Sequence, residues 1–152
     1  MKLINRHLRT GLAALLAVGV LSALPLAHDA MAAKAGARTV VYHIDDSARA
    51  IPMIRNITNH RRADADIRIV VVALGAGIDF LVEDAMDDRG NSYDALVDPL
   101  MAERVEFRVC NNTLNGRGIS ADNLLPDVKV VPSGVAEVAR LQIEEDAAYL
   151  KP

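Results

Sequence analysis

The sequence contains very little aromatic surface. Among its 152 residues there is no tryptophan, and there are only three tyrosines and two phenylalanines. Proteins that stack nucleobases or sugar rings rely on aromatic side chains, so this composition argues against such a binding surface. The hydrophobic core must instead be built from valine, isoleucine, leucine, alanine and methionine.

An excess of positive charge is also missing. Lysine and arginine total 17 against 20 aspartates and glutamates, which gives a formal net charge of −3 at pH 7. An acidic domain without a basic stripe is not expected to bind nucleic acid or an anionic membrane surface. The chain has a single cysteine, Cys110, which excludes a disulfide within the chain.

The one long apolar run lies at the amino terminus. Residues 11–26 carry no charge and follow a positive head made by Lys2, Arg6 and Arg9. The Ala-Met-Ala sequence at 30–32 fits the small-x-small rule for signal cleavage. This pattern predicts a signal peptide over residues 1–32, cleaved near Ala32, and a periplasmic or secreted protein.

The alternative is an uncleaved membrane anchor. The apolar run is shorter than the ~18–20 residues that a spanning helix needs, and Pro25 interrupts its end. No later segment is long and apolar enough to span a membrane, so no membrane association is expected after cleavage. Residues 33–152 are expected to form one domain, because they contain no linker, repeat or low-complexity tract.

Strand-like and helix-like segments alternate along residues 33–152. Three consecutive valines at 70–72 indicate a strand buried on both faces, which is typical of a parallel sheet covered by helices. The order predicts an α/β fold: an open, mostly parallel sheet of about five strands with helices on both faces, in a flavodoxin-like three-layer sandwich. The expected strands are at 37–45, 66–75, 105–110, 127–132 and 148–151.

Two helical segments near the carboxyl terminus bear on the site. The polar residues 111–120 are expected to form a turn or a short helix that Gly116 and Gly118 end. Ser133 is a suitable N-cap for a helix whose buried face would carry Val135, Val138 and Leu141.

Functional groups in open α/β sheets collect outside the carboxyl ends of the strands. Three candidates follow strands in this chain: His43 with Asp45, the turn holding Gly75 and Gly77, and Cys110. They are distant in sequence, but the predicted fold would bring them along one edge of the sheet.

Cys110 is the leading candidate for chemistry. A thiol just before a turn that opens a helix faces amide N–H groups, which favour the thiolate and lower its pKa. Asn111, Asn112 and Thr113 would supply further hydrogen bonds, and Arg117 would add positive potential. The alternative is that Cys110 is simply a small apolar residue ending a buried strand.

The other candidates carry weaker signals. His43 would either shape the pocket or serve as a hydrogen-bonded structural residue, and no recognised ligand spacing surrounds it, so no metal is expected. The turn with Gly75 and Gly77 would offer amides to an anion, although Phe80 stands where a dinucleotide fingerprint needs glycine. No Cys-x-x-Cys, Ser-His-Asp or phosphate-loop pattern is present.

Several segments together resemble the DsrE/DsrF family of sulfur-relay proteins, in an exported version. The most specific are "VEFRVCNNTL", the following "GRGI", and "VVPSGVAEVARLQ" leading to "AYLKP". The resemblance implies a small α/β domain that assembles into homo-oligomers, with trimers and hexamers among the forms of the family. It also implies that the cysteine closing the third strand carries sulfur as a persulfide, and Cys110 matches that position.

The sequence therefore suggests a periplasmic sulfur carrier or sulfurtransferase acting through Cys110, without a cofactor. The sulfur donor and the acceptor thiol are not indicated. A second hypothesis is a non-catalytic exported binding or assembly module in which Cys110 is structural. A third is a redox sensor that dimerises through Cys110.

Overall fold

The computed structural model describes residues 38–152, so the predicted signal peptide lies outside the described residues. Five parallel strands form one sheet in the order β4-β3-β2-β1-β5. They are β1 Thr39–Ile44, β2 Arg68–Ala73, β3 Glu106–Cys110, β4 Lys129–Val131 and β5 Ala148–Leu150. The predicted α/β fold with a five-stranded parallel sheet is confirmed.

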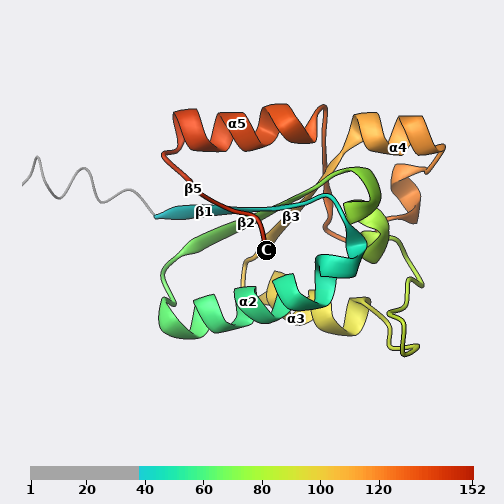
Figure 1. Ribbon diagram of the computed structural model, residues 1–152, viewed down its shortest axis with the longest axis horizontal. Helices are drawn as coiled ribbons and strands as arrows, with labels where there is room; N and C mark the ends of the chain where they lie inside the picture. Colours follow the sequence, from blue (N-terminus) through green and yellow to red (C-terminus); the bar gives the residue numbers. More distant parts are fainter. Residues whose placement is uncertain (1–37) are drawn as a thin grey trace, which may run out of the picture. The chain divides into compact units, whose positions relative to one another are not determined.

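Helices cover both faces of this sheet (Figure 1). Helices α2 (Ala50–Ala63) and α3 (Asp94–Ala102) lie against one face, and α5 (Gly134–Glu144) lies against the other. Helix α4 (Asn111–Arg117) follows β3 directly. Three short 3-10 helices complete the fold: η1 Ser47–Arg49, η2 Gly75–Leu81 and η3 Ala121–Asn123. Within the described residues, no helix combines the length and apolar character needed to cross a bilayer.

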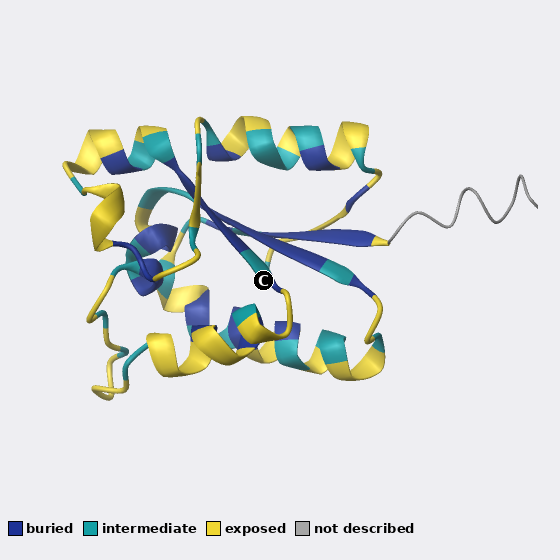
Figure 2. Ribbon diagram, turned by 180° about the vertical axis from the view of Figure 1, so that it is seen from behind, coloured by how far each residue is buried: buried dark blue, intermediate teal, exposed yellow. Residues whose placement is uncertain are grey.

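The alternation of side chains along the strands divides the core into two parts. Ile69 and Val71 of β2 belong to the larger hydrophobic cluster, with α2 and α3. Val70 and Val72 point the other way and pack with Leu141 of α5 in a smaller cluster. This two-sided burial, visible as the dark strands between paler helices in Figure 2, explains why β2 is a continuous apolar run.

The prediction for the face of α5 was wrong, and the prediction for the end of α4 was right for Gly118 but not for Gly116. Val135 is 68% exposed, because Gly134 takes the sheet-facing position at the start of α5 and turns Val135 outward. Gly116 does not end a helix: α4 continues to Arg117 and is capped by Gly118, whose φ of 65° is the left-handed conformation that glycine adopts easily.

Candidate thiol site

Cys110 ends β3 and is at the same time the N-cap residue of α4. Phe107 and Val109 face the larger core cluster, so Cys110 points to the opposite face, where α5 lies. The residue is only 5% exposed. The thiol is therefore held in a confined space between the sheet and α5.

Gly134, the first residue of α5, packs directly against the Cys110 side chain. A β-carbon added to Gly134 would lie 3.1 Å from the Cβ of Cys110 and 3.1 Å from Cδ2 of Leu74. Both distances are tighter than ordinary van der Waals contact. Glycine thus allows the backbone of α5 to approach Cys110 more closely than any other residue would.

Two helix N-termini consequently converge on one sulfur atom. Helix α4 begins immediately after Cys110, and α5 begins at Gly134. The first N–H groups of a helix have no acceptor inside it, and they carry the positive end of the helix dipole. An anion at the position of the Cys110 Sγ is favoured by both.

The pKa of Cys110 reflects this arrangement. Burial raises it, because desolvation disfavours the charged thiolate. Hydrogen bonding from the backbone N–H groups of Gly134, Thr113 and Asn112 and from the Thr113 side chain acts in the opposite direction. The net effect is a pKa below the ordinary value of 9.0. The polar surroundings therefore outweigh the burial and favour the nucleophilic form of the thiol.

Thr113 also joins the thiol to the turn after β2. Its Oγ1 accepts a hydrogen bond of 3.0 Å from the backbone N–H of Gly75 while the hydroxyl hydrogen remains available to Cys110. One hydroxyl can donate and accept at the same time. Thr113 therefore fixes the thiol at the end of β3 relative to the turn that follows β2.

The other residues predicted around Cys110 have different positions. Asn112 contributes its backbone N–H, and Asn111 is the half-buried first residue of α4. Arg117 lies at the far end of α4, where it contacts the carboxylate of Asp79 at 2.6 Å and donates to the carbonyl of Gly75 at 3.1 Å. Its charge is thus neutralised by Asp79, and its contacts brace the turn after β2.

The glycine turn is held by internal hydrogen bonds. Gly75, with a φ of 58°, donates to Thr113, and Gly77 donates to the carbonyl of Leu74 at 3.0 Å. A β-carbon at Gly77 would lie 2.4 Å from the carbonyl oxygen of Ile44, so the turn packs against the end of β1. The amides that were expected to bind an anion are therefore engaged within the protein.

His43 lies away from the thiol. The strand register aligns His43 with Val72 and Val72 with Arg108, which places His43 two strands, about 9–10 Å, from the strand that carries Cys110. Its Nδ1 is 2.8 Å from the hydroxyl oxygen of Tyr149. Burial lowers the pKa of His43, while nearby Asp45 acts to raise it. The structure joins His43 to β5 and not to the thiol.

Gly134 and Leu74 were missed by the sequence analysis. The available signal was Ser133-Gly134 directly after a predicted strand, because a helix that starts there begins at the same edge of the sheet as Cys110. Ser133 does cap this helix, since its hydroxyl oxygen accepts from the backbone N–H of Ala136. Residues 38–152 show no group of three or more His, Cys, Asp or Glu side chains placed to hold a metal ion.

Comparisons with known proteins agree with this architecture. A protein of unknown function from Methanobacterium thermoautotrophicum, MTH1491, is 37% identical, with a TM-score of 0.68 over 76% of this chain and 99% of that one. The ychN protein of E. coli shares the fold at 17% identity, with a TM-score of 0.62 over 77% of this chain and 100% of that one. The curated proteins include no match. The sequence model of the DsrE/DsrF-like family matches residues 23–151, and the chain belongs to that family.

Proposed function

We propose that the protein carries sulfane sulfur as a persulfide on Cys110 and transfers it to an acceptor thiol. Membership of the DsrE/DsrF-like family suggests a sulfur-relay role. The observation that carries the proposal is the convergence of the α4 and α5 N-termini on the single thiol, which lowers its pKa despite its burial. A structural core cysteine needs no such set of donors.

The reaction is an exchange of sulfur–sulfur bonds. The Cys110 thiolate attacks the terminal sulfur of a donor persulfide, R–S–SH. A bond forms between that sulfur and the Cys110 Sγ as the donor S–S bond breaks, and R–S⁻ leaves with the electron pair. An acceptor thiolate then attacks the terminal sulfur of Cys110–S–SH and releases the Cys110 thiolate. The sulfur atom keeps its oxidation state throughout, so no external oxidant or reductant is consumed.

The hydrogen-bond donors have a defined role in both steps. The backbone N–H groups of Gly134, Thr113 and Asn112 stabilise the thiolate before the first step and again as it leaves in the second. The 5% exposure of Cys110 favours slender donors, such as a low-molecular-weight persulfide or inorganic polysulfide, over a persulfide carried by a bulky protein.

The test is intact-mass measurement of the mature domain, residues 33–152, after incubation with inorganic polysulfide. The wild type is expected to gain one sulfur atom, which a low-molecular-weight thiol removes, and Cys110→Ser is expected to gain none. The proposal fails if the wild type gains no sulfur under conditions in which glutathione does.

One observation favours the alternative, an exported binding or assembly module with a structural Cys110: the thiol is almost fully buried. That function predicts slow labelling of the native thiol, fast labelling in denaturant and no sulfur gain.

We also propose export and homo-oligomerisation. Exposed apolar residues on α5, Val135 at 68% and Ile143 at 82%, support an interface between copies. Sedimentation of the mature domain measures its oligomeric state.

A further inference from the structure

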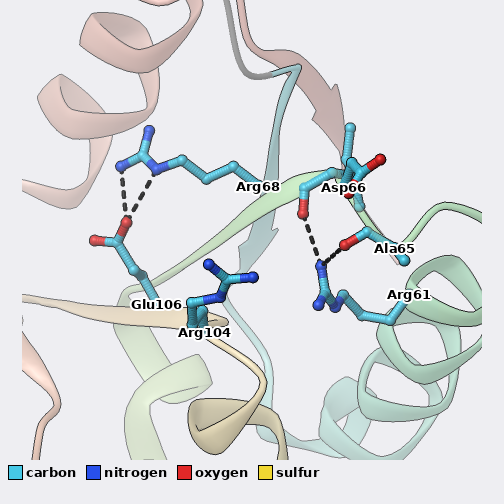
Figure 3. A pocket seen from close by; sticks show the side chains of 7 residues that line it. Arg61, Ala65, Asp66, Arg68, Arg104 and Glu106 are labelled. Atoms are coloured by element: carbon cyan, nitrogen blue, oxygen red, sulfur yellow. Dashed lines mark hydrogen bonds and ion pairs between the residues drawn. The ribbon is translucent and has the colours of Figure 1, made fainter.

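A polar cavity lies at the edge of the sheet opposite Cys110, where α2 ends and β2 and β3 begin. Its volume is about 450 Å³. Figure 3 shows this cavity from close by. Its walls hold three arginines and two carboxylates, and the lining residues are Arg61, Ala65, Asp66, Ile67, Arg68, Arg104 and Glu106. None of these residues contributes to the site around Cys110.

Arg104 occupies a backbone position suited to glycine. Its φ is 67°, in the left-handed region. It follows the end of α3, where its N–H bonds to the carbonyl of Met101 at 2.8 Å and the N–H of Val105 bonds to Leu100 at 2.9 Å. Glycine is the usual residue at this position after a helix, because a β-carbon there is unfavourable. The presence of arginine therefore points to a use for its side chain.

The Arg104 side chain reaches into the cavity without a protein partner. Figure 3 shows its guanidinium between the Arg68–Glu106 pair on one side and Arg61 on the other. Among the described residues, Arg104 makes no side-chain hydrogen bond or ion pair. Its guanidinium therefore has five N–H donors available to a ligand.

The neighbouring charges do not satisfy these donors. The Glu106 carboxylate is already bound by Arg68 at 2.8 Å, Arg108 at 2.7 Å and Lys129 at 2.9 Å, so three cations compensate its charge. Asp66, the other carboxylate of the lining, is exposed, as Arg104 is, and the two side chains form no ion pair.

Arg61 forms a fixed wall of the cavity. Its Nη1 donates to the carbonyl of Ala65 at 2.7 Å and to that of Ile67 at 3.0 Å. Its Nε is buried and lies 3.8 Å from a Glu103 carboxylate oxygen, without a hydrogen bond. The Arg61 charge is thus held in place beside the guanidinium of Arg104.

We propose that this cavity binds a small oxyanion, with Arg104 as the principal ligand and Arg61 supplying positive potential; Arg68 is already paired with Glu106 and Glu145. A guanidinium fork matches the oxygens of phosphate, sulfate and carboxylate groups. The cavity is larger than one such group, so the physiological ligand is a small molecule that carries it. This inference concerns the edge of the sheet opposite Cys110 and does not depend on the sulfur chemistry.

The decisive variant is Arg104→Gly. Glycine relieves the strained φ, so the variant should fold and, in chloride buffer, melt at the same temperature as the wild type or higher. The probes are inorganic phosphate and acetate, each compared with chloride at equal ionic strength. Phosphate should raise the thermal midpoint of the wild type, and acetate should raise it less because it carries a smaller charge. The expected loss of phosphate affinity in Arg104→Gly is roughly tenfold or more.

Arg62→Gln is the charge-matched control. Arg62 lies on α2, is exposed, and is absent from the cavity lining. Its substitution removes one positive charge and should leave the phosphate effect intact. The proposal is overturned if phosphate fails to stabilise the wild type relative to chloride, or if Arg104→Gly responds to phosphate as strongly as Arg62→Gln does.

Discussion

The backbone of Gly134 packs so closely on Cys110 that a β-carbon at position 134 would lie 3.1 Å from the Cys110 Cβ. This contact brings the start of α5 to a thiol that already caps α4. The two residues belong to neighbouring strand–helix connections, after β3 and after β4. The site is thus made by the parallel sheet, which sets two helix N-termini side by side.

Gly134→Ala should raise the pKa of Cys110 and slow its reaction with iodoacetamide at neutral pH. The added methyl group would crowd Cys110 and Leu74 and move the α5 backbone away from the sulfur. Crowding of this kind typically costs about 1–3 kcal/mol of unfolding free energy. Gly116→Ala is the matched control, because a β-carbon there meets no atom within 4 Å. An unchanged thiol pKa in Gly134→Ala would contradict the role of α5.

Thr113→Val should also raise the pKa of Cys110. Valine has a similar shape but cannot donate to the sulfur, and it leaves the Gly75 N–H without its 3.0 Å acceptor. Loss of one such hydrogen bond costs about 1 kcal/mol of unfolding free energy. Thr113→Ser keeps the hydroxyl and should retain the wild-type pKa. The measurement is the alkylation rate as a function of pH, and equal behaviour of the two variants would count against the hydroxyl.

Glu137→Gln should destabilise the fold more than Arg140→Gln. Glu137 of α5 pairs with Arg108 of β3, and their side chains are only 12% and 11% exposed. Removing one charge from a buried pair is costly. Because Arg108 retains its ion pair with Glu106, we expect the unfolding free energy measured in urea to fall by only about 2 kcal/mol. Arg140 is 36% exposed, and its loss should cost under about 1 kcal/mol.

The ion pair between Glu137 and Arg108 should also affect the pKa of Cys110. Arg108 precedes Cys110 by two residues on one face of β3, and Glu137 lies one helical turn beyond Gly134. Glu137→Gln removes a negative charge and leaves Arg108 less compensated, so it should lower the pKa of Cys110, whereas Arg140→Gln removes a positive charge and should not lower it. A destabilised Glu137→Gln with a wild-type thiol pKa would show that the pair acts on stability alone.

Glu106 should make the stability of the fold depend on acidic pH. Burial acts to raise its pKa, but hydrogen bonds from Arg108, Lys129 and Arg68 dominate and lower it from 4.5 to about 2. A depressed pKa means that the stabilisation is present above pH 4.5 and is lost as the pH falls from 4.5 towards 2. The shift corresponds to at most about 3 kcal/mol.

Urea unfolding of Glu106→Gln at a series of acidic pH values checks this expectation. The variant should be less stable than the wild type at pH 7, and its unfolding free energy should fall less between pH 4.5 and 2. Glu83→Gln, at an exposed residue without an ion pair among the described residues, should keep the wild-type slope. Parallel slopes for wild type and Glu106→Gln would contradict the assignment.

The sheet was predictable from the sequence because burial patterns are local. The valines of β2 and the N-cap Ser133 identify their elements without tertiary information. The position of Cys110 at the end of β3 was likewise visible in the change from apolar to polar residues. These features depend on a few consecutive residues.

The partners of the thiol were harder to predict because they depend on strand order. Only the placement of β4 beside β3 brings Gly134 to Cys110, and only the register places His43 two strands away. Arg117 is close to the thiol in sequence, but α4 places its side chain against Asp79. Contacts between separate connections of the sheet are therefore the part that a single sequence leaves undetermined.

The most direct test of the thiol site is the pH dependence of Cys110 alkylation in the native protein, compared with the same chain in urea. Stabilisation of the thiolate by the two helix N-termini predicts a native titration midpoint below that of the unfolded chain, whose thiol should titrate near 9.0. A native midpoint at or above the unfolded one would contradict this account, because burial would then outweigh the donors from α4 and α5.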